Sequence, residues 1–528
     1  MRFLLINPFC PISEGPTPPL GLSFVAAALE RAGIEVKILD FVIFPYSYVT
    51  LEQVLNKFQP DVVGATSVTM TFDNAVNIIK DVKRINNEIV TIMGGPHVTF
   101  CAERTFNQYP EVDYILLGEG EETIVEFCRE LEKSKNWRSI KGLAYRDGNQ
   151  ICQTEQRLPI DVNTLPLPAR HLLPLGRYRT LNTAISMTTS RGCPFKCIFC
   201  IGRKMVGSKV RYREPMSVVN ELEYLSTLGF PQVNIADDLF TAKKEHCLSI
   251  CNEMINRELN IKWSSFARVD TVSSEVLKKM QLAGCSAVSF GVETANTEIL
   301  KTIKKGITLP KVINAIEMCT DAGIEPHVSF IIGLPGETPE TLEETKEFGE
   351  KISSIGASYG YHLLAPFPGT AVRDENEKYD LNILTDDWTQ YHANRAIVET
   401  KAVSKEMLNK IAIEWDQAVI EKLDGMRTSM EQGTASKDDA WSINNLDRFV
   451  FVYDLMMNEG IEKNGTWENG EGPIEYQQAL KELSERISSA TGKNNSDNLE
   501  MLNYINDKKG LNLSQDKDIV KWEWNNYL

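Results

Sequence analysis

The stretch Arg191-Gly192-Cys193-Pro194-Phe195-Lys196-Cys197-Ile198-Phe199-Cys200 decides how the rest of this chain is interpreted. It places three cysteines within eight residues, on a loop that opens with Gly-Cys-Pro and follows an apolar segment. Three thiolates so close together can bind three irons of a [4Fe–4S] cubane, whereas electron-transfer ferredoxins use four. Cys193, Cys197 and Cys200 therefore predict a cluster with one iron open to a small-molecule ligand. The amino and carboxylate groups of S-adenosylmethionine (SAM) supply such a ligand.

Two other interpretations of the triad stay open at this point. The thiols are either ordinary core or surface cysteines, or a zinc site that lacks one ligand. A zinc site needs a fourth Cys or His close by, and the nearest histidines, His171 and His246, are remote in sequence. Cys247 and Cys251 are one helical turn apart on an apolar face, so we interpret them as core residues rather than as a second cluster.

The triad follows the first of six repeated β/α units. Helical patterns such as Pro215–Leu228, Ser273–Ala283 and Pro339–Ile355 separate the strands, and Thr338-Pro339 is typical of a helix start. The predicted strands are Ala184–Thr189, Val233–Ala236, Lys262–Ala267, Ala287–Val292, His327–Ile332 and Ser358–Leu364. Six such units in succession predict an incomplete, TIM-like (β/α)6 barrel over residues 184–375, with its chemistry at the carboxyl ends of the strands.

Residues 1–139 show an earlier β/α alternation. Amphipathic helical patterns at Leu20–Ala32 and Phe72–Asn86 lie between short apolar strands. The predicted strands are Phe3–Asn7, Glu35–Phe41, Asp61–Ser67, Ile89–Gly94 and Tyr114–Gly118. This order predicts a doubly wound, flavodoxin-like (Rossmann-type) α/β domain whose ligands bind at the carboxyl edge of the sheet.

The remaining segments are less regular. Residues 140–183 are predicted to form a connector with a hairpin at Asp147-Gly148 and a proline-rich extended stretch. Residues 376–528 predict a mostly helical C-terminal region, with a loop at Glu459–Pro473, that covers the barrel mouth or helps to form the substrate pocket.

Composition limits the classes of partner. The formal net charge of −16 and the pI of about 5.1 disfavour nucleic acid and anionic membranes. No apolar run reaches the ~18–20 residues that span a bilayer. The N-terminus lacks the basic region and cleavage site of a signal peptide, so we expect a cytoplasmic protein.

The C-x3-C-x2-C motif resembles that of the radical SAM superfamily, and successive strand ends support the likeness. The resemblance implies that Asp238 binds the methionine amino group, that Arg268 meets the SAM carboxylate or ribose, and that Glu293 binds the ribose hydroxyls. It also implies an adenine site formed by Phe199 and by the backbone at Ile332 and Gly333.

The N-terminal domain joined to such a barrel resembles the cobalamin-binding (B12-binding domain) radical SAM family, in the branch of the anaerobic Mg-protoporphyrin monomethyl ester cyclase. The likeness implies a corrin at the sheet edge, near small or polar residues: Ser67, Thr69, Gly94, Gly95, His97, Gly118 and Gly120. The loop from Pro8 to Gly15 departs from the Asp-x-His-x-x-Gly pattern of other cobalamin proteins because it has no histidine, so we expect no histidine on the lower face of cobalt.

What the resemblance implies for function is reductive cleavage of SAM, with electrons from an external one-electron donor such as flavodoxin or ferredoxin. The leading hypothesis is a cobalamin-dependent methyltransferase that acts on an unactivated carbon of a small molecule. A cyclase or oxidative rearrangement enzyme with a non-methylating cobalamin is the second. A corrinoid or Fe–S sensor without turnover is the third. The sequence identifies neither the substrate nor a catalytic residue that reacts with it.

Overall fold

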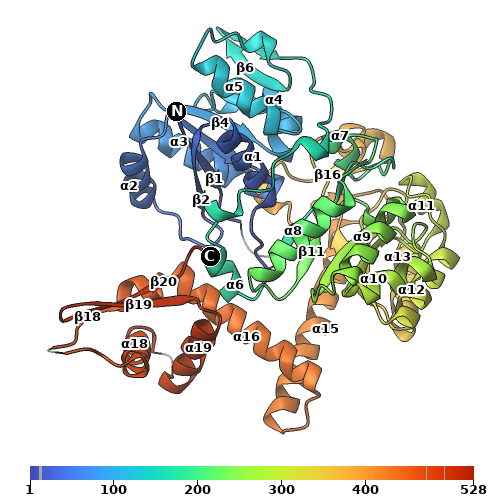
Figure 1. Cartoon of the computed structure of the whole chain (residues 1–528). Coiled ribbons are helices and arrows are strands. Elements are labelled where there is room, and N and C mark those ends of the chain that lie inside the picture. Colours follow the sequence, from blue (N-terminus) through green and yellow to red (C-terminus); the bar gives the residue numbers. More distant parts are fainter. Residues whose placement is uncertain (11–14, 471, 493) are drawn as a thin grey trace.

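The computed structural model describes residues 1–10, 15–470, 472–492 and 494–528, and its first domain is a parallel sheet with helices on both faces (Figure 1). The strand order is β2-β1-β3-β4-β5, which confirms the doubly wound, flavodoxin-like prediction. The strands are β1 (Arg2–Asn7), β2 (Glu35–Asp40), β3 (Val62–Thr66), β4 (Val90–Gly94) and β5 (Tyr114–Leu116). The helices are α1 (Leu20–Arg31), α2 (Tyr48–Phe58), α3 (Phe72–Ile85), α4 (Pro96–Gln108) and α5 (Glu121–Leu131).

The predicted hairpin forms as β6 (Leu143–Asp147) and β7 (Gln150–Gln153). It pairs antiparallel with β5 and so makes the sheet seven-stranded, which extends the first domain beyond the predicted boundary at residue 139. The physical reason is that β5 would otherwise leave its outer backbone groups unpaired at a sheet edge.

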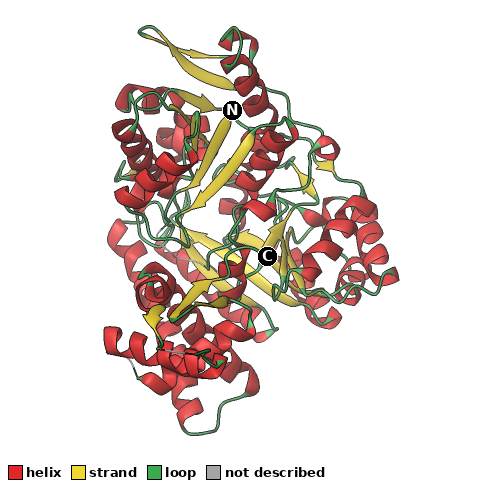
Figure 2. Ribbon diagram, turned by 60° about the vertical axis from the view of Figure 1, so that its left-hand side comes forward, coloured by secondary structure: helices red, strands yellow, loops and turns green. Residues whose placement is uncertain are grey.

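The second domain is an open barrel of six parallel strands, as predicted, and Figure 2 shows its strands covered by helices. In the described residues β15 and β8 are the two edges of this sheet. Its strands are β8 (Ile185–Met187), β11 (Val233–Ile235), β12 (Trp263–Ala267), β13 (Cys285–Glu293), β14 (Glu325–Ile332) and β15 (Ser358–Leu363). The main covering helices are α8 (Pro215–Thr227), α9 (Lys244–Asn256), α10 (Ser274–Leu282), α12 (Leu309–Ala322) and α13 (Pro339–Ser354). At the start of α13 the Thr338 side chain accepts a hydrogen bond from the Thr341 backbone, which confirms the predicted cap.

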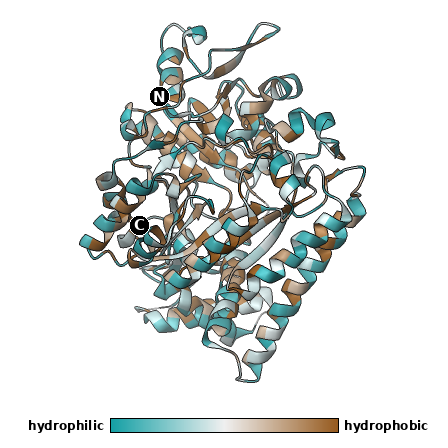
Figure 3. Cartoon of the chain, turned by 90° about the vertical axis from the view of Figure 1, so that its right-hand side faces the viewer, coloured by the Kyte–Doolittle hydropathy of each residue, from teal (hydrophilic) through white to brown (hydrophobic). Residues whose placement is uncertain are grey.

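The two faces of the barrel strands differ in chemistry. The residues beneath the helices are large, apolar and buried, for example Trp263, Phe290 and Phe330. Cys247 and Cys251 of α9 are completely buried in the same core, as predicted. The helices accordingly show one apolar and one polar side (Figure 3).

After the barrel the chain forms a long helical hairpin and then a lobe with its own hydrophobic core. The helices are α15 (Lys405–Glu431), α16 (Lys437–Met457), α17 (Gly460–Asn464), α18 (Tyr476–Thr491) and α19 (Asn495–Asp507). The region is mostly helical, as predicted, but it also contains an unpredicted antiparallel sheet of β18 (Thr466–Glu468), β20 (Ile519–Trp524) and β19 (Leu511–Asp516). The predicted loop at Glu459–Pro473 is therefore wrong for α17 and β18, and residue 471 lies outside the described part. Trp467, Trp522 and Trp524 are buried in this lobe, which explains why a polar stretch becomes a strand.

This C-terminal lobe packs against the connector helix α6 (Leu175–Thr180) and the segment after β2, where it shares a core with Ile43, Tyr178 and Leu181 (Figure 1). In Figure 1 the lobe lies at the lower left, and the barrel helices α10, α12 and α13 lie at the right. Among the described residues no helix is both long and apolar enough to cross a lipid bilayer.

We expect Gly176→Ala to loosen the C-terminal lobe. A Cβ at Gly176 would lie 1.7 Å from the Asn525 carbonyl oxygen, and the Gly176 N–H donates to Asn526 at 3.0 Å. Such overpacking costs about 1–3 kcal/mol, so the tail should become sensitive to limited proteolysis at lower temperature than in the wild type. Gly425→Ala is the matched control, because nothing lies within 4 Å of its added Cβ. Equal protection of the tail in both variants would refute the expectation.

Candidate active site

The cysteine loop leaves the barrel at the end of β8 and returns through a short ribbon. β9 (Ser190–Arg191) and β10 (Arg211–Tyr212) pair antiparallel and form its neck. Inside the neck the Cys193 N–H donates to the Gly207 carbonyl at 3.1 Å. Gly192 has φ +113, and a Cβ there would lie 2.4 Å from the Lys209 carbonyl oxygen. Glycine before the first cysteine is therefore required by the close approach of the two sides of the loop.

The three sulfurs sit in surroundings that suit a cluster. The Gly202 N–H donates to Cys200 Sγ at 3.3 Å, and hydrogen bonds of this kind tune cluster ligands. Burial raises the pKa of Cys197, whereas Lys305 and then Arg268 lower it. The charge of Cys193 also acts on Cys197 and raises its pKa, so these two thiols are near neighbours. A donor set of three sulfurs beside two cations fits an anionic [4Fe–4S] cluster.

Two aspartates at the end of β11 have different roles. Asp237 is buried and accepts hydrogen bonds from the Thr189 N–H, the Thr189 hydroxyl and the Ser190 hydroxyl, each at 2.6 Å. Asp238 is exposed and accepts from the Gly192 N–H at 3.2 Å. A Cβ on Gly202 would touch both Asp238 Oδ1 and Cys200 Sγ. The structure thus brings predicted Asp238 to the cysteine loop, while Asp237 fixes the strand end.

The ends of β12 and β13 bring Arg268 and Glu293 to this place, each with a charged partner. Arg268 forms a bidentate ion pair with Asp270 at 2.9 and 3.0 Å and lies 3.6 Å from the Phe195 ring centroid. Glu293 pairs with Lys305 at 2.7 Å, and both side chains are buried. Glu293 has φ +74, a conformation that is strained outside glycine and that clusters at functional sites. Lys305 also lies 5.9 Å from the ring of predicted Phe199.

The turn after β14, which includes predicted Ile332 and Gly333, is held by a carboxyl group of its own. The N–H groups of Gly333 and Leu334 donate to Glu337 Oε2 at 2.6 and 3.0 Å. Ile332 is buried, and Gly333 adopts φ +91 against Leu408 and Val398. The carboxyl group of Glu337 therefore braces the segment for which the resemblance implied adenine binding. Among the described residues, Glu337 Oε1 is buried without a hydrogen-bond partner.

Glu337 makes the stability of the barrel depend on pH. Burial raises its pKa from 4.5 to about 8, against the opposing effect of the two backbone hydrogen bonds. Because the pKa of Glu337 is higher in the folded than in the unfolded chain, the fold has its full stability below pH 4.5. It loses part of this stability as the pH rises from 4.5 through 8, where the buried carboxyl group must ionise. We expect Glu337→Gln, which keeps the acceptor and never ionises, to gain about 3 kcal/mol over the wild type at neutral pH and nothing at acid pH. Melting temperatures between pH 5 and 9 measure this.

The control for that experiment is Glu340→Gln, because Glu340 is fully exposed at the start of the same helix. Its melting curve should follow that of the wild type across the pH range. Parallel curves for Glu337→Gln and wild type would contradict the assignment.

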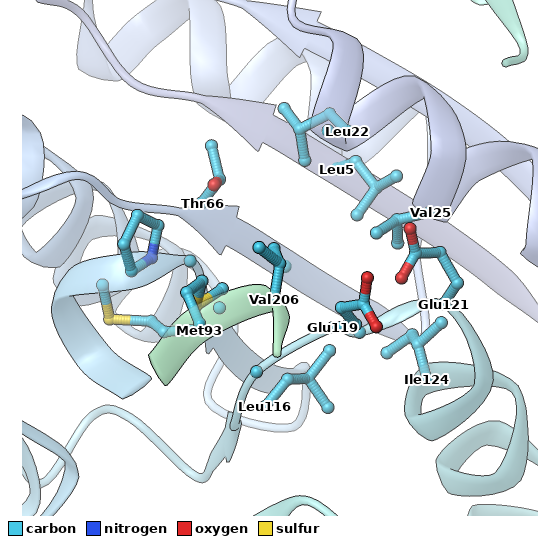
Figure 4. Close-up of a pocket in the computed structure, with 18 of the residues that line it drawn as sticks. Leu5, Leu22, Val25, Thr66, Met93, Leu116, Glu119, Glu121, Ile124 and Val206 are labelled. Atoms are coloured by element: carbon cyan, nitrogen blue, oxygen red, sulfur yellow. The ribbon is translucent and has the colours of Figure 1, made fainter. Parts of the chain in front are cut away.

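A cavity of about 360 Å³ opens at the carboxyl edge of the first sheet (Figure 4). The wall from the first domain includes Leu5, Thr66, Met93 and Leu116, together with predicted Gly94, Gly118 and Gly120. The opposite wall comes from the barrel, and Val206 and Glu119 approach the cavity from the two domains in Figure 4. A largely apolar cleft with a glycine-lined rim fits a flat heteroaromatic group such as the corrin tail.

Of the other predicted corrin contacts, Gly95 also lines the cavity, and Ser67 lies at the neighbouring turn. Ser67 is buried, and its hydroxyl has no hydrogen-bond partner within the described ranges, which suits a ligand contact. Gly95 has φ +104, and a Cβ there would lie 2.5 Å from the Ser67 carbonyl oxygen, so this glycine serves the packing of two turns. The Pro8–Gly15 loop lies partly outside the described residues, which omit 11–14.

His97 and Thr69 form a pair of their own. His97 Nδ1 lies 3.3 Å from Thr69 Oγ1, and its ring lies 4.1 Å from Phe72 and 4.8 Å from Trp388. Burial, together with the nearby charges of Arg104 and Arg373, lowers the pKa of His97 to about 3, so the imidazole is neutral. The pair thus packs against Trp388, which belongs to the segment that follows the barrel.

Sequence reasoning missed three charged side chains of the site: Lys305, Glu337 and Glu119. Lys305 follows a helix rather than a strand, and Glu337 resembles an ordinary residue before a helix cap. Only the Gly-Glu-Gly-Glu-Glu loop at residues 118–122 carried a visible signal, and its acidic members were not assigned.

Comparison with known proteins agrees with this site. Residues 12–128 match the B12 binding domain model, and residues 187–349 match the Radical SAM superfamily model. The chain belongs to the B12-binding radical SAM family and is an enzyme. The cofactors of that family are a [4Fe–4S] cluster, SAM and cobalamin.

Among individual proteins, the chain is 33% identical over 397 residues to an uncharacterized methyltransferase of Pyrococcus horikoshii, covering 75% of this chain and 86% of the relative. It is 30% identical to the anaerobic magnesium-protoporphyrin IX monomethyl ester cyclase of Cereibacter sphaeroides, covering 75% and 66%. In fold it is similar to the cobalamin-dependent SAM radical enzyme OxsB with aqua-cobalamin and SAM bound (TM-score 0.68, 18% identity, 96% of this chain and 78% of that one).

Proposed function

We propose that this enzyme uses cobalamin and SAM to methylate a carbon atom of a polar small molecule. One observation carries the proposal: the cavity in the first domain and the cysteine loop share a wall. Arg191, Met205 and Val206, which flank the three cysteines, line the cavity together with Gly94 and its neighbours. Two cofactors held on either side of this wall would face each other across the domain boundary.

Each cofactor has its own set of residues in the proposal. Cys193, Cys197 and Cys200 hold the cluster. Asp238, Arg268 and Glu293 surround SAM, with Phe199 and the turn at Ile332–Gly333 near its adenine. Ser67, Thr69 and the glycines at 94, 95, 118 and 120 would hold the corrin at the cavity, and His97 would position Thr69. The bound cluster supplies the electron that breaks the SAM sulfonium bond, and the bound cobalamin carries the methyl group.

The overall reaction converts a substrate C–H bond into C–CH3. One SAM donates the methyl group and leaves as S-adenosylhomocysteine. A second SAM accepts the displaced hydrogen atom and leaves as methionine and 5′-deoxyadenosine. Two electrons from an external donor such as flavodoxin or ferredoxin balance the two positive charges of the sulfonium groups.

The open face of the barrel supports a polar substrate. The residues that face away from the covering helices include exposed Phe266 together with small side chains that carry hydroxyl or amide groups: Ser186, Asn234, Ser264, Ser289, Ser329 and Ser358. His327 Nδ1 lies 3.0 Å from Ser358 Oγ, and exposed His362 lies on the same face. An apolar polycycle would remove water from these groups without replacing its hydrogen bonds, at a cost in free energy.

The second candidate is a cyclase or oxidative rearrangement, favoured by the 30% identity to the porphyrin cyclase. Membership in an enzyme family removes the sensor hypothesis. The deciding experiment incubates reconstituted, corrinoid-loaded protein with SAM, a strong reductant and pools of polar metabolites. Formation of S-adenosylhomocysteine with 5′-deoxyadenosine and a product heavier by one methylene supports methylation. 5′-Deoxyadenosine with an isomerised or oxidised product supports the second candidate. Protein that never retains a corrinoid contradicts both.

A further inference from the structure

The carboxylate of Glu119 stands at the boundary between the two domains. It belongs to the loop after β5, and its side chain is 9% exposed. Arg211 donates to both of its oxygens at 2.9 Å, and Arg191 donates to Oε1 at 3.1 Å. The Ile160 backbone N–H adds a bond to Oε2 at 3.0 Å. One residue of the first domain thus accepts hydrogen bonds from two arginines of the second.

These two arginines are partners in the neck of the cysteine loop. Arg211 pairs with Arg191 across the β9–β10 ribbon, and all three cysteines lie on the chain between them. Arg211 also donates to the Val206 carbonyl at 2.7 Å inside the loop. The neck is tight at Gly192, where an added Cβ would lie 2.4 Å from the Lys209 carbonyl oxygen, so the two sides of the loop are packed directly against each other.

The same group of residues touches the cavity. Glu119 and Arg191 both line it, as do Gly118 and Val206. Glu121 adds a second carboxylate 2.8 Å from Arg191 and is likewise buried. The cluster of charges therefore contains two carboxylates and two guanidinium groups, and it forms part of the cavity wall.

We propose that Glu119 is a positioning residue that couples the cavity of the first domain to the cysteine loop, so that filling the cavity changes the reduction potential of the cluster. The inference rests on the proposed function and goes beyond it. A ligand in the cavity lies against Glu119 and Arg191, and the ribbon passes any change in their positions to Cys193. Coupling of two binding sites is reciprocal, so reconstitution of the cluster also changes the affinity for the corrinoid.

The test is a redox titration of the reconstituted full chain, followed by electron paramagnetic resonance of the reduced cluster, with and without hydroxocobalamin. The wild type should show different midpoint potentials in the two states. Glu119→Gln leaves one guanidinium uncompensated, so its corrinoid-free potential should rise and its response to hydroxocobalamin should be lost. Arg211→Lys keeps the charge but cannot bind both oxygens, and its response should shrink with little change in the corrinoid-free potential.

Glu122→Gln is the matched control, because Glu122 lies in the first turn of α5, three residues after Glu119, and pairs with Arg157 instead. It should respond as the wild type does. If the wild type binds cluster and corrinoid and its potential does not move, or if Glu119→Gln and Arg211→Lys respond like the wild type, the inference is overturned and the proposed function stands. A wild type that fails to take up either the cluster or the corrinoid overturns the proposed function, and the inference with it.

Discussion

Replacing Cys197 with alanine is expected to reduce SAM cleavage to background and to abolish the charge-transfer absorption of the cluster. The charges of Lys305 and Arg268 lower the pKa of Cys197 and that of Glu293 raises it, so this thiol lies near three side chains of the proposed SAM site. A cubane with two protein ligands has two open irons and is not retained through reconstitution. Iron content, absorption and 5′-deoxyadenosine release measure the loss. The same result is expected for Cys193→Ala and Cys200→Ala.

The control is Cys152→Ala on the outer strand β7, a half-buried cysteine of the hairpin. This variant should keep iron, absorption and SAM cleavage. Retention of the cluster in any variant of the triad would sink the assignment of the metal ligands.

Replacing Lys305 with methionine is expected to destabilise the barrel by about 3–5 kcal/mol, because it leaves the Glu293 carboxylate buried without its partner. The two side chains are 10% and 7% exposed and their charged atoms are 2.7 Å apart. Urea denaturation of variant and wild type measures the difference.

Two further variants separate the ion pair from simple loss of a lysine. Lys301→Met removes an exposed pair with Glu298 on the preceding helix and should cost no more than about 1 kcal/mol. The double variant Lys305→Met with Glu293→Gln no longer buries a charge and should regain part of the loss. If it is no more stable than Lys305→Met alone, the buried pair is not the cause.

The fold could be predicted in large part from periodicity. Each of the eleven predicted strands appears in the structure, with ends displaced by at most a few residues, because buried parallel strands form short apolar runs between amphipathic helices. The three-stranded sheet of the C-terminal lobe could not be predicted, because its strands carry polar residues on one face and depend on tryptophans brought together by the fold.

The site shows the same division. The cysteine spacing was sufficient for the cluster hypothesis because all three ligands lie on one short loop. Lys305 could not be found, since its partner Glu293 is twelve residues away on the other side of a helix. Glu337 could not be found either, because only its burial separates it from the exposed glutamates that follow it along α13.

By itself the sequence therefore determined the succession of β/α units, the flavodoxin-like and open-barrel classes, and the place of the cysteines at a strand end. Only the tertiary structure decided that the cysteine loop and the cavity of the first domain share a wall, and that Glu119 joins them. The physical reason is the distance along the chain over which each effect acts. Hydrophobic periodicity and ligand spacing act over a few neighbouring residues, whereas the Glu119–Arg211 contact joins side chains 92 positions apart, which meet only when both domains have folded.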